Sequence, residues 1–126
     1  MKFSMQKNGF SGSLPFGDLL VSSDENYGFR PYQLLVASLA VCSGGVMRKV
    51  LEKMRMPAET IEINVKEVTR IEEEANRVAK VHLHFVLRGS IDEARMPKVM
   101  ELTRKNCSMV QSVADSIEVV ETYEIR

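Results

Sequence analysis

The chain has 126 residues, of which 44% are hydrophobic and 27% charged, a composition typical of a globular protein with a core of its own. Basic and acidic residues number 17 each, which excludes the charge excess that binds nucleic acid or an anionic membrane surface. The first residues lack the apolar core of a secretory signal, so we expect a cytoplasmic protein whose thiols stay reduced. We expect a single domain over residues 1–126, with no cofactor and no bound metal.

The first part of the chain predicts short strands followed by one long helix. Residues 1–29 are rich in glycine, serine, asparagine and aspartate, with only short apolar groups. Pro31 suits the first turn of a helix, and apolar residues recur at helical spacing to about Met54. A continuous helix here would be about 37 Å long, which is long for one compact chain of this size. We therefore expect a break at Gly44-Gly45 or a homodimer with this helix near the interface.

The remainder of the chain predicts a sheet and two shorter helices. Three segments alternate apolar and polar residues with the period of a strand: 61–66, 80–88 and 117–125. A hairpin loop at 73–76 joins the first two. Between the last two, helices are expected to start near Ser90 and near Cys107. Because the strands and helices do not alternate, the fold class is predicted to be α+β.

Two cysteines are the main candidates for chemistry. Cys42 lies within the long apolar helix, where cysteine is commonly a small core residue and where burial raises the pKa of a thiol. Cys107 follows Arg104 and Lys105 and opens a helix, where free N–H groups favour a thiolate. Taken by themselves, these contexts favour a structural Cys42, and they leave open whether Cys107 is reactive or structural.

Two other features have simpler explanations than catalysis. His82 and His84 share one face of a strand and could together bind a metal, but that face is expected to be solvated. Gly44-Gly45 lies within a helix and is not followed by the lysine of a phosphate-binding loop. We interpret the histidines as surface residues and the glycines as a site of close packing.

The cysteine contexts are similar to those of a known family. The stretch RPYQLLVASLAVCSGGVM, residues 30–47, resembles the central helix of the OsmC/Ohr family, the osmotically inducible and organic hydroperoxide resistance proteins. In that family a cysteine follows the helix-opening proline at the spacing of Pro31 and Cys42. A second cysteine opens a late helix, as Cys107 does in RKNCSMVQSV. The resemblance implies an OsmC-like α+β fold, with antiparallel sheets around a long buried central helix in an intertwined homodimer.

The resemblance also implies a function, a thiol-dependent organic hydroperoxide reductase with a role in stress and detoxification. Cys42 would attack the peroxide as a thiolate and become a sulfenic acid. Cys107 would then condense with it to a disulfide, which a dithiol reduces. The partners implied are a second copy of the chain, a small hydroperoxide and a dithiol reductant.

The chain departs from the family pattern at the groups that activate the first cysteine. The family's peroxidases have an arginine in the N-terminal strands and a glutamate directly after the proline. Here residues 1–29 contain no arginine, Tyr32 follows the proline, and Ser108 replaces a proline expected after the second cysteine. Arg30 and Arg104 are candidate substitutes for the missing cation. Two alternatives are a non-catalytic dimer that binds a small apolar ligand and a thiol redox sensor.

Overall fold

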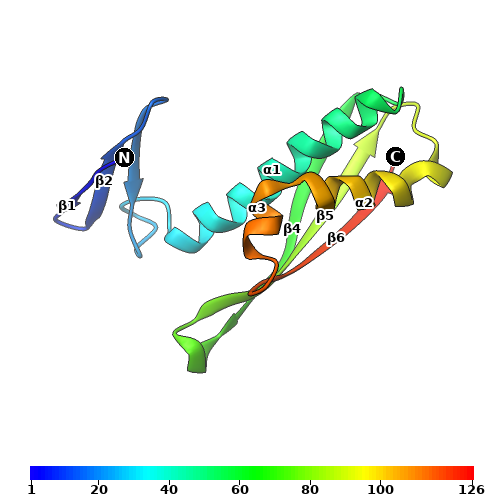
Figure 1. The fold of residues 1–126 in the computed structure, drawn as a ribbon. Coiled ribbons are helices and arrows are strands. Elements are labelled where there is room, and N and C mark those ends of the chain that lie inside the picture. Colours follow the sequence, from blue (N-terminus) through cyan, green and yellow to red (C-terminus); the bar gives the residue numbers. More distant parts are fainter. The chain divides into compact units, whose positions relative to one another are not determined.

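The computed structural model describes residues 1–126 and divides them into two compact units, Met1–Ala37 and Ser38–Arg126. The first unit contains an antiparallel sheet in the order β1-β2-β3. Its strands are β1 (Phe3–Gln6), β2 (Gly9–Ser13) and β3 (Asp18–Val21) (Figure 1). The short strands and turns predicted for residues 1–29 are therefore confirmed.

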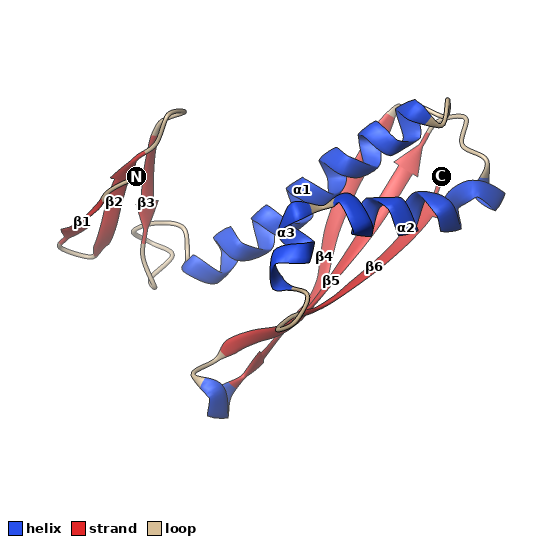
Figure 2. Ribbon diagram, in the orientation of Figure 1, coloured by secondary structure: helices blue, strands red, loops and turns tan.

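The second unit contains the sheet β4-β5-β6 and the helices that pack on it (Figure 2). Its elements are most of α1 (Pro31–Lys53), then β4 (Thr60–Ile71), β5 (Arg77–Arg88), α2 (Met96–Asn106), α3 (Ser108–Val113) and β6 (Glu118–Ile125). Two short 3-10 turns precede β5 and α2: Glu72–Glu74 and Glu93–Arg95. This arrangement confirms the predicted α+β class.

The long helix α1 is continuous, so the break considered at Gly44-Gly45 does not occur. A Cβ added at Gly44 would lie 2.5 Å from Cδ1 of Ile63 on β4, which confirms the interpretation of this glycine as a close approach. Leu39 and Met47 of the same helix are fully buried. By length and hydropathy α1 is also apolar enough to cross a membrane, a test that the core helix of a soluble protein passes as well.

The second sheet is only partly antiparallel. Strands β4 and β5 form the predicted hairpin, but β6 pairs with β5 in parallel, from Lys80 beside Glu118 to Leu87 beside Ile125. The expectation of antiparallel sheets is therefore wrong for β6. The reason is the connection between β5 and β6: it contains α2 and α3, and a helical crossover of this length returns the chain in the same direction.

One face of this sheet lies against the helices. Paired residues on neighbouring strands point to the same side, and one row across the sheet consists of Val65, Leu83 and Glu121. The next row contains Ile63, whose side chain meets α1, so this is the face that the helices cover. Leu83 is fully buried. Glu121 is thus a carboxylate on an otherwise apolar face.

The start of the second helix differs from the prediction. Asp92 accepts a hydrogen bond from the Ala94 N–H, but this cap belongs to the 3-10 turn, and α2 itself begins at Met96. Pro97 lies in the first turn of α2. Since proline is tolerated there but not in a helix interior, it fixes the helix start later than Ser90.

Candidate active site

Two pairs of adjacent residues bring the predicted site together within the second unit. Cys42 and Ser43 lie on α1, and Cys107 and Ser108 lie where α2 ends and α3 begins. The Cys42 Sγ is 3.7 Å from Ser108 Oγ, and the Ser43 hydroxyl donates to Cys107 Sγ at 3.4 Å. The Cys107 thiol also lies close enough to Cys42 to help lower the pKa of the Cys42 thiol. The two cysteines, far apart in sequence, are therefore neighbours in the fold.

The Cys42 thiol is the more acidic of the pair. Cys42 is half-buried, and the backbone N–H of Met109 is the strongest influence that lowers its pKa. Burial acts in the opposite direction, while the Cys107 thiol and the hydroxyl and N–H of Ser108 lower the pKa further. Hydrogen bonds that favour the charged form thus outweigh desolvation. Their donors are the first backbone amides of α3 and the side chains next to them.

The Cys107 thiol has the opposite character. It is fully buried, and this burial raises its pKa, although the Ser43 hydroxyl and the Val110 N–H act against the shift. The neighbouring Cys42 raises the pKa further. The helix start that favours a thiolate at Cys107 in the sequence thus acts on Cys42 instead. The reason is that the first N–H groups of α3 reach across to Cys42, while the Cys107 side chain turns into the core.

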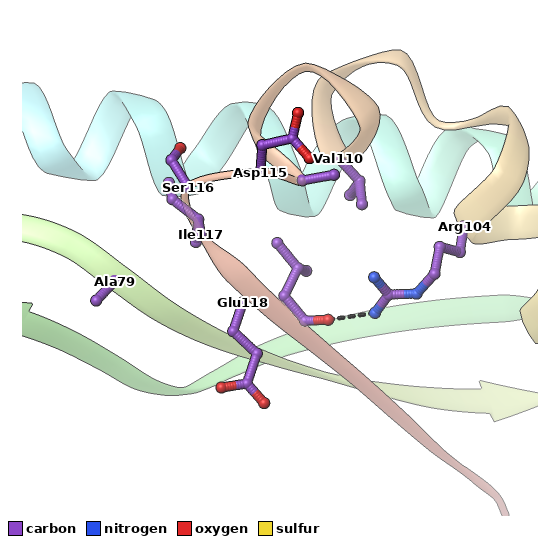
Figure 3. Close-up of a pocket in the computed structure, with 9 residues that line it drawn as sticks. Ala79, Arg104, Val110, Asp115, Ser116, Ile117 and Glu118 are labelled. Atoms are coloured by element: carbon purple, nitrogen blue, oxygen red, sulfur yellow. Dashed lines mark hydrogen bonds between the residues drawn. The ribbon is translucent and has the colours of Figure 1, made fainter.

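Arg104, one of the two candidate arginines, is engaged by groups other than Cys42. Arg104 Nη2 lies 3.1 Å from Glu121 Oε1 and also donates to the Val119 carbonyl. Figure 3 shows the Arg104 side chain reaching from α2 toward β6 at a cavity of about 450 Å³, which has no cysteine in its lining. Arg30, in the first unit, holds its guanidinium 4.9 Å above the ring of Tyr32.

Sequence reasoning missed two polar residues beside the cysteines. Ser43 is fully buried, and nothing in its local sequence distinguishes it. The side chain of Glu121 is only 4% exposed. It interrupts the apolar alternation of Val119 and Tyr123 on β6, and this interruption is a signal that could have identified it.

The histidines are less exposed than predicted. His82 Nε2 and His84 Nδ1 each lie 2.7 Å from Thr122 Oγ1, and His84 Nε2 lies 3.1 Å from Glu124 Oε1. Both are half-buried because β5 is the central strand and β6 covers one side of it. No group of three or more histidine, cysteine, aspartate or glutamate side chains is arranged to hold a metal ion.

A comparison with protein families decides where the chain belongs. Residues 23–122, which include both cysteines and most of the fold, match the family described as OsmC-like protein. The chain belongs to the OsmC-like family. No curated protein matches it in sequence.

Solved structures show the same fold at low sequence identity. A hypothetical protein from Aquifex aeolicus is 20% identical with a TM-score of 0.87, and the match covers 99% of this chain and 93% of that one. An OsmC-like protein from Mycoplasma pneumoniae is 10% identical with a TM-score of 0.81, over 98% and 94%. The organic hydroperoxide resistance protein OhrB of Bacillus subtilis is 17% identical with a TM-score of 0.65, over 98% and 96%. This OsmC-like chain therefore has the OsmC-like fold.

Proposed function

We propose that this OsmC-like protein reduces organic hydroperoxides with the thiols of Cys42 and Cys107. The observation that carries the proposal is the unequal thiol pair, in which a half-buried Cys42 of lowered pKa contacts a fully buried Cys107 of raised pKa. The thiolate is the nucleophile in peroxide reduction. The organic hydroperoxide resistance protein from Bacillus subtilis adds support through its similar fold.

The reaction needs both thiols in turn. The Cys42 thiolate attacks one oxygen of the O–O bond, the other oxygen leaves as an alcohol after protonation, and Cys42 becomes a sulfenic acid. The Cys107 sulfur then attacks the Cys42 sulfur, a disulfide forms and water is released. A dithiol finally reduces this disulfide to two thiols. Because the two thiols are neighbours in the fold, the Cys107 sulfur has only a short distance to cover in the second step.

Backbone amides take the place of the family's charged side chains in this proposal. The N–H groups of Ser108 and Met109 lower the pKa of Cys42 without a guanidinium or a carboxylate. Hydrogen bonds to a charged group stabilise it by about 1.5–3 kcal/mol each. Together these donors favour the thiolate form of Cys42 and outweigh the opposing effect of burial on its pKa.

The test uses the reduced full-length chain with cumene hydroperoxide and dithiothreitol. Wild type should consume peroxide over many turnovers, whereas Cys42→Ser should lose essentially all of the protein-dependent consumption. When dithiothreitol is omitted, Cys107→Ser should be oxidised once by the peroxide and accumulate a sulfenic acid on Cys42, which dimedone traps. Mass spectrometry of the intact protein and a peroxide assay provide the two measurements.

The outcomes separate the proposal from its alternatives. Peroxide consumption by wild type that does not exceed that of Cys42→Ser would overturn it. Formation of the disulfide without repeated turnover would instead identify a redox sensor. Absence of both reactions would leave the ligand-binding dimer as the better hypothesis.

A further inference from the structure

Two serine hydroxyls flank the two cysteines, and they differ in their exposure to solvent. Ser43 is fully buried, and its hydroxyl donates to Cys107 Sγ at 3.4 Å. Ser108 is exposed, and its Oγ lies 3.7 Å from Cys42 Sγ. The sulfur that attacks the peroxide in the proposed function is therefore next to a hydroxyl group that solvent reaches.

The hydrogen-bond donors that α3 presents to the Cys42 sulfur are of two kinds. The N–H groups of Ser108 and Met109 belong to the backbone of a helix, so their direction toward the sulfur is fixed. The Ser108 hydroxyl is a side-chain group, and its hydrogen turns about the Cβ–Oγ bond to suit the acceptor that is present. One of these donors can therefore follow a charge that moves, and the other two cannot.

Peroxide reduction moves a negative charge from sulfur to oxygen. Before the attack the charge is on the Cys42 thiolate, and after it the sulfur is a neutral sulfenic acid and the charge is on the oxygen that leaves. An alkoxide is a far stronger base than a thiolate, so the leaving oxygen gains more from a donor than the sulfur does. Donors that meet charge where it develops make a large contribution to catalysis.

Other polar side chains close to the cysteines in the second unit are already engaged. The Ser43 hydroxyl donates to Cys107, and Arg104 Nη2 lies 3.1 Å from Glu121 Oε1 and donates to a backbone carbonyl. The Ser108 hydroxyl, by contrast, has the reacting sulfur itself as its hydrogen-bond partner. Among these side chains, Ser108 is the one placed to donate to an oxygen that approaches Cys42.

We propose that Ser108 is a catalytic residue, whose hydroxyl donates to the leaving oxygen of an alkyl hydroperoxide as Cys42 attacks. The inference deepens the proposed function and rests on it, because it names the donor for one step of that reaction. In the resting protein the hydroxyl donates to the Cys42 thiolate. During the attack it turns to the leaving oxygen, while the N–H groups of Ser108 and Met109 stay on the sulfur.

The step is balanced in atoms and electrons. A lone pair of the Cys42 thiolate forms a bond to the terminal oxygen of the hydroperoxide, the O–O bond breaks, and the other oxygen leaves with the bonding pair. The Ser108 hydroxyl gives its proton to that oxygen, which departs as an alcohol. Ser108 then takes a proton from solvent, to which it is exposed. The sulfur is oxidised to a sulfenic acid, and the peroxide is reduced.

The test compares two reactions of the same thiolate in the full-length chain. Every variant is made in a Cys107→Ser parent, so that Cys42 is the only thiol. Its reactions with cumene hydroperoxide and, separately, with iodoacetamide are followed by mass spectrometry of the intact protein, with dimedone present in the first to trap the sulfenic acid. The pH is set above the measured titration of Cys42 in each variant. Because iodide leaves without a proton, the ratio of the peroxide rate to the alkylation rate measures assistance to the leaving oxygen.

Ser108→Ala should lower this ratio about tenfold or more, because it removes a donor from the transition state. Ser108→Thr keeps a hydroxyl at the same place and should retain most of the ratio of the parent. The matched control is Ser112→Ala, which removes a hydroxyl that donates to the Ser108 carbonyl at 2.7 Å. It alters α3 without removing a contact to the Cys42 sulfur, so the ratio should not change.

Two results would overturn the role of Ser108. One is a ratio in Ser108→Ala equal to that of the parent, whether neither rate changes or both fall together, and hydroperoxide reduction by Cys42 would then stand without it. The other is a parent that iodoacetamide labels but cumene hydroperoxide does not oxidise. In that case the proposed function fails, and this inference fails with it.

Discussion

Three hydrogen-bond donors from α3 reach the Cys42 sulfur: the N–H of Met109 and both the hydroxyl and the N–H of Ser108. Backbone amides do not titrate, so their effect on the thiol is the same across the physiological pH range. They also carry no net charge, which makes the effect less sensitive to salt than an arginine at the protein surface. At the scale of single residues, the acidity of Cys42 therefore depends on how α3 begins.

Substitution of Ser108 separates the contributions of its two donors. Ser108→Ala removes the hydroxyl, and Ser108→Pro removes the hydroxyl and the N–H together. Proline fits here because Ser108 is the first residue of α3 and Cys107 before it is extended, with φ −84° and ψ 106°. The pKa of Cys42 should rise from wild type to Ser108→Ala and rise again in Ser108→Pro, because each substitution removes a donor that favours the thiolate.

The measurement is the pH dependence of iodoacetamide alkylation at Cys42, made in a Cys107→Ser background so that one thiol reacts. Ser112→Ala, which removes another hydroxyl of α3, is the control and should leave the titration unchanged. Equal titrations in wild type and Ser108→Pro would contradict the role given to the N–H groups.

The sequence singled out Cys42 and Cys107, but their local contexts alone did not indicate which thiol is the more acidic. Burial and helix position were inferred from local context, and this context places Cys107 at the start of α3. Which thiol receives the N–H groups of α3 depends on the packing of α1 against that segment, and no local pattern encodes this. Ser43 was missed for the same reason, whereas Glu121 carried a visible signal as a charge within an apolar strand face.

At the scale of elements, the contact between α1 and β4 fixes where the cysteine helix lies. Gly44 has room for no Cβ while Ile63 keeps its present rotamer, since the two atoms would be 2.5 Å apart. Alanine is favoured over glycine within a helix by about 0.8–1 kcal/mol. The change in the free energy of unfolding caused by Gly44→Ala is therefore the difference between this gain and the cost of moving Ile63.

A double-mutant cycle isolates that cost. Ile63→Val removes the Cδ1 methyl group and should destabilise the chain by about 0.5–1.5 kcal/mol. Gly44→Ala should be more favourable in the Ile63→Val background than in wild type, with a coupling of about 0.5–2 kcal/mol measured by urea unfolding. If the effects of the two substitutions on the free energy of unfolding are additive, Ile63 does not restrict the side chain at position 44.

The elements themselves follow from the sequence to different degrees. Helix α1 was predicted within about one residue at each end, because Pro31 and the loss of apolar periodicity mark its limits. The parallel pairing of β6 was not predicted, because alternation gives the faces of a strand and not its direction. The late start of α2 was not predicted either. The residues after the Asp92 cap form a separate 3-10 turn and are not the first turn of α2.

At the scale of the whole molecule, we propose that the protein is a homodimer with α1 near the interface. Large apolar side chains are exposed in the single chain, among them Phe10 at 51% and Phe16 at 106% in the first unit and Val41 at 71% on α1. Exposed large apolar side chains in each unit are the kind of surface that a partner covers. The length and continuity of α1 also favour a second copy of this chain as the partner that covers these side chains.

The dimer is tested by placing a charge on the exposed side of α1. Wild type should have a mass near twice 14.2 kDa by size-exclusion chromatography with light scattering. Val41→Glu should weaken the dimer by tenfold or more, because a desolvated charge at an interface is costly. Asn64→Glu adds the same charge at an exposed position on β4 and should leave the mass unchanged. A wild-type mass of 14.2 kDa would contradict the proposal.

In the proposed mechanism, the contacts of Cys42 with Ser108 and of Cys107 with Ser43 would link the oxidation state of the cysteines to the mobility of α3. In the reduced protein the Cys42 sulfur accepts hydrogen bonds from the start of α3, which has only six residues. A disulfide sulfur carries no charge and is a weak acceptor, so oxidation leaves those N–H groups without their partner. A helix this short has little stability of its own. Local unfolding of α3 should therefore be easier once the cysteines are joined. The mobility of α3 would then indicate whether Cys42 and Cys107, which lie outside this helix, are oxidised.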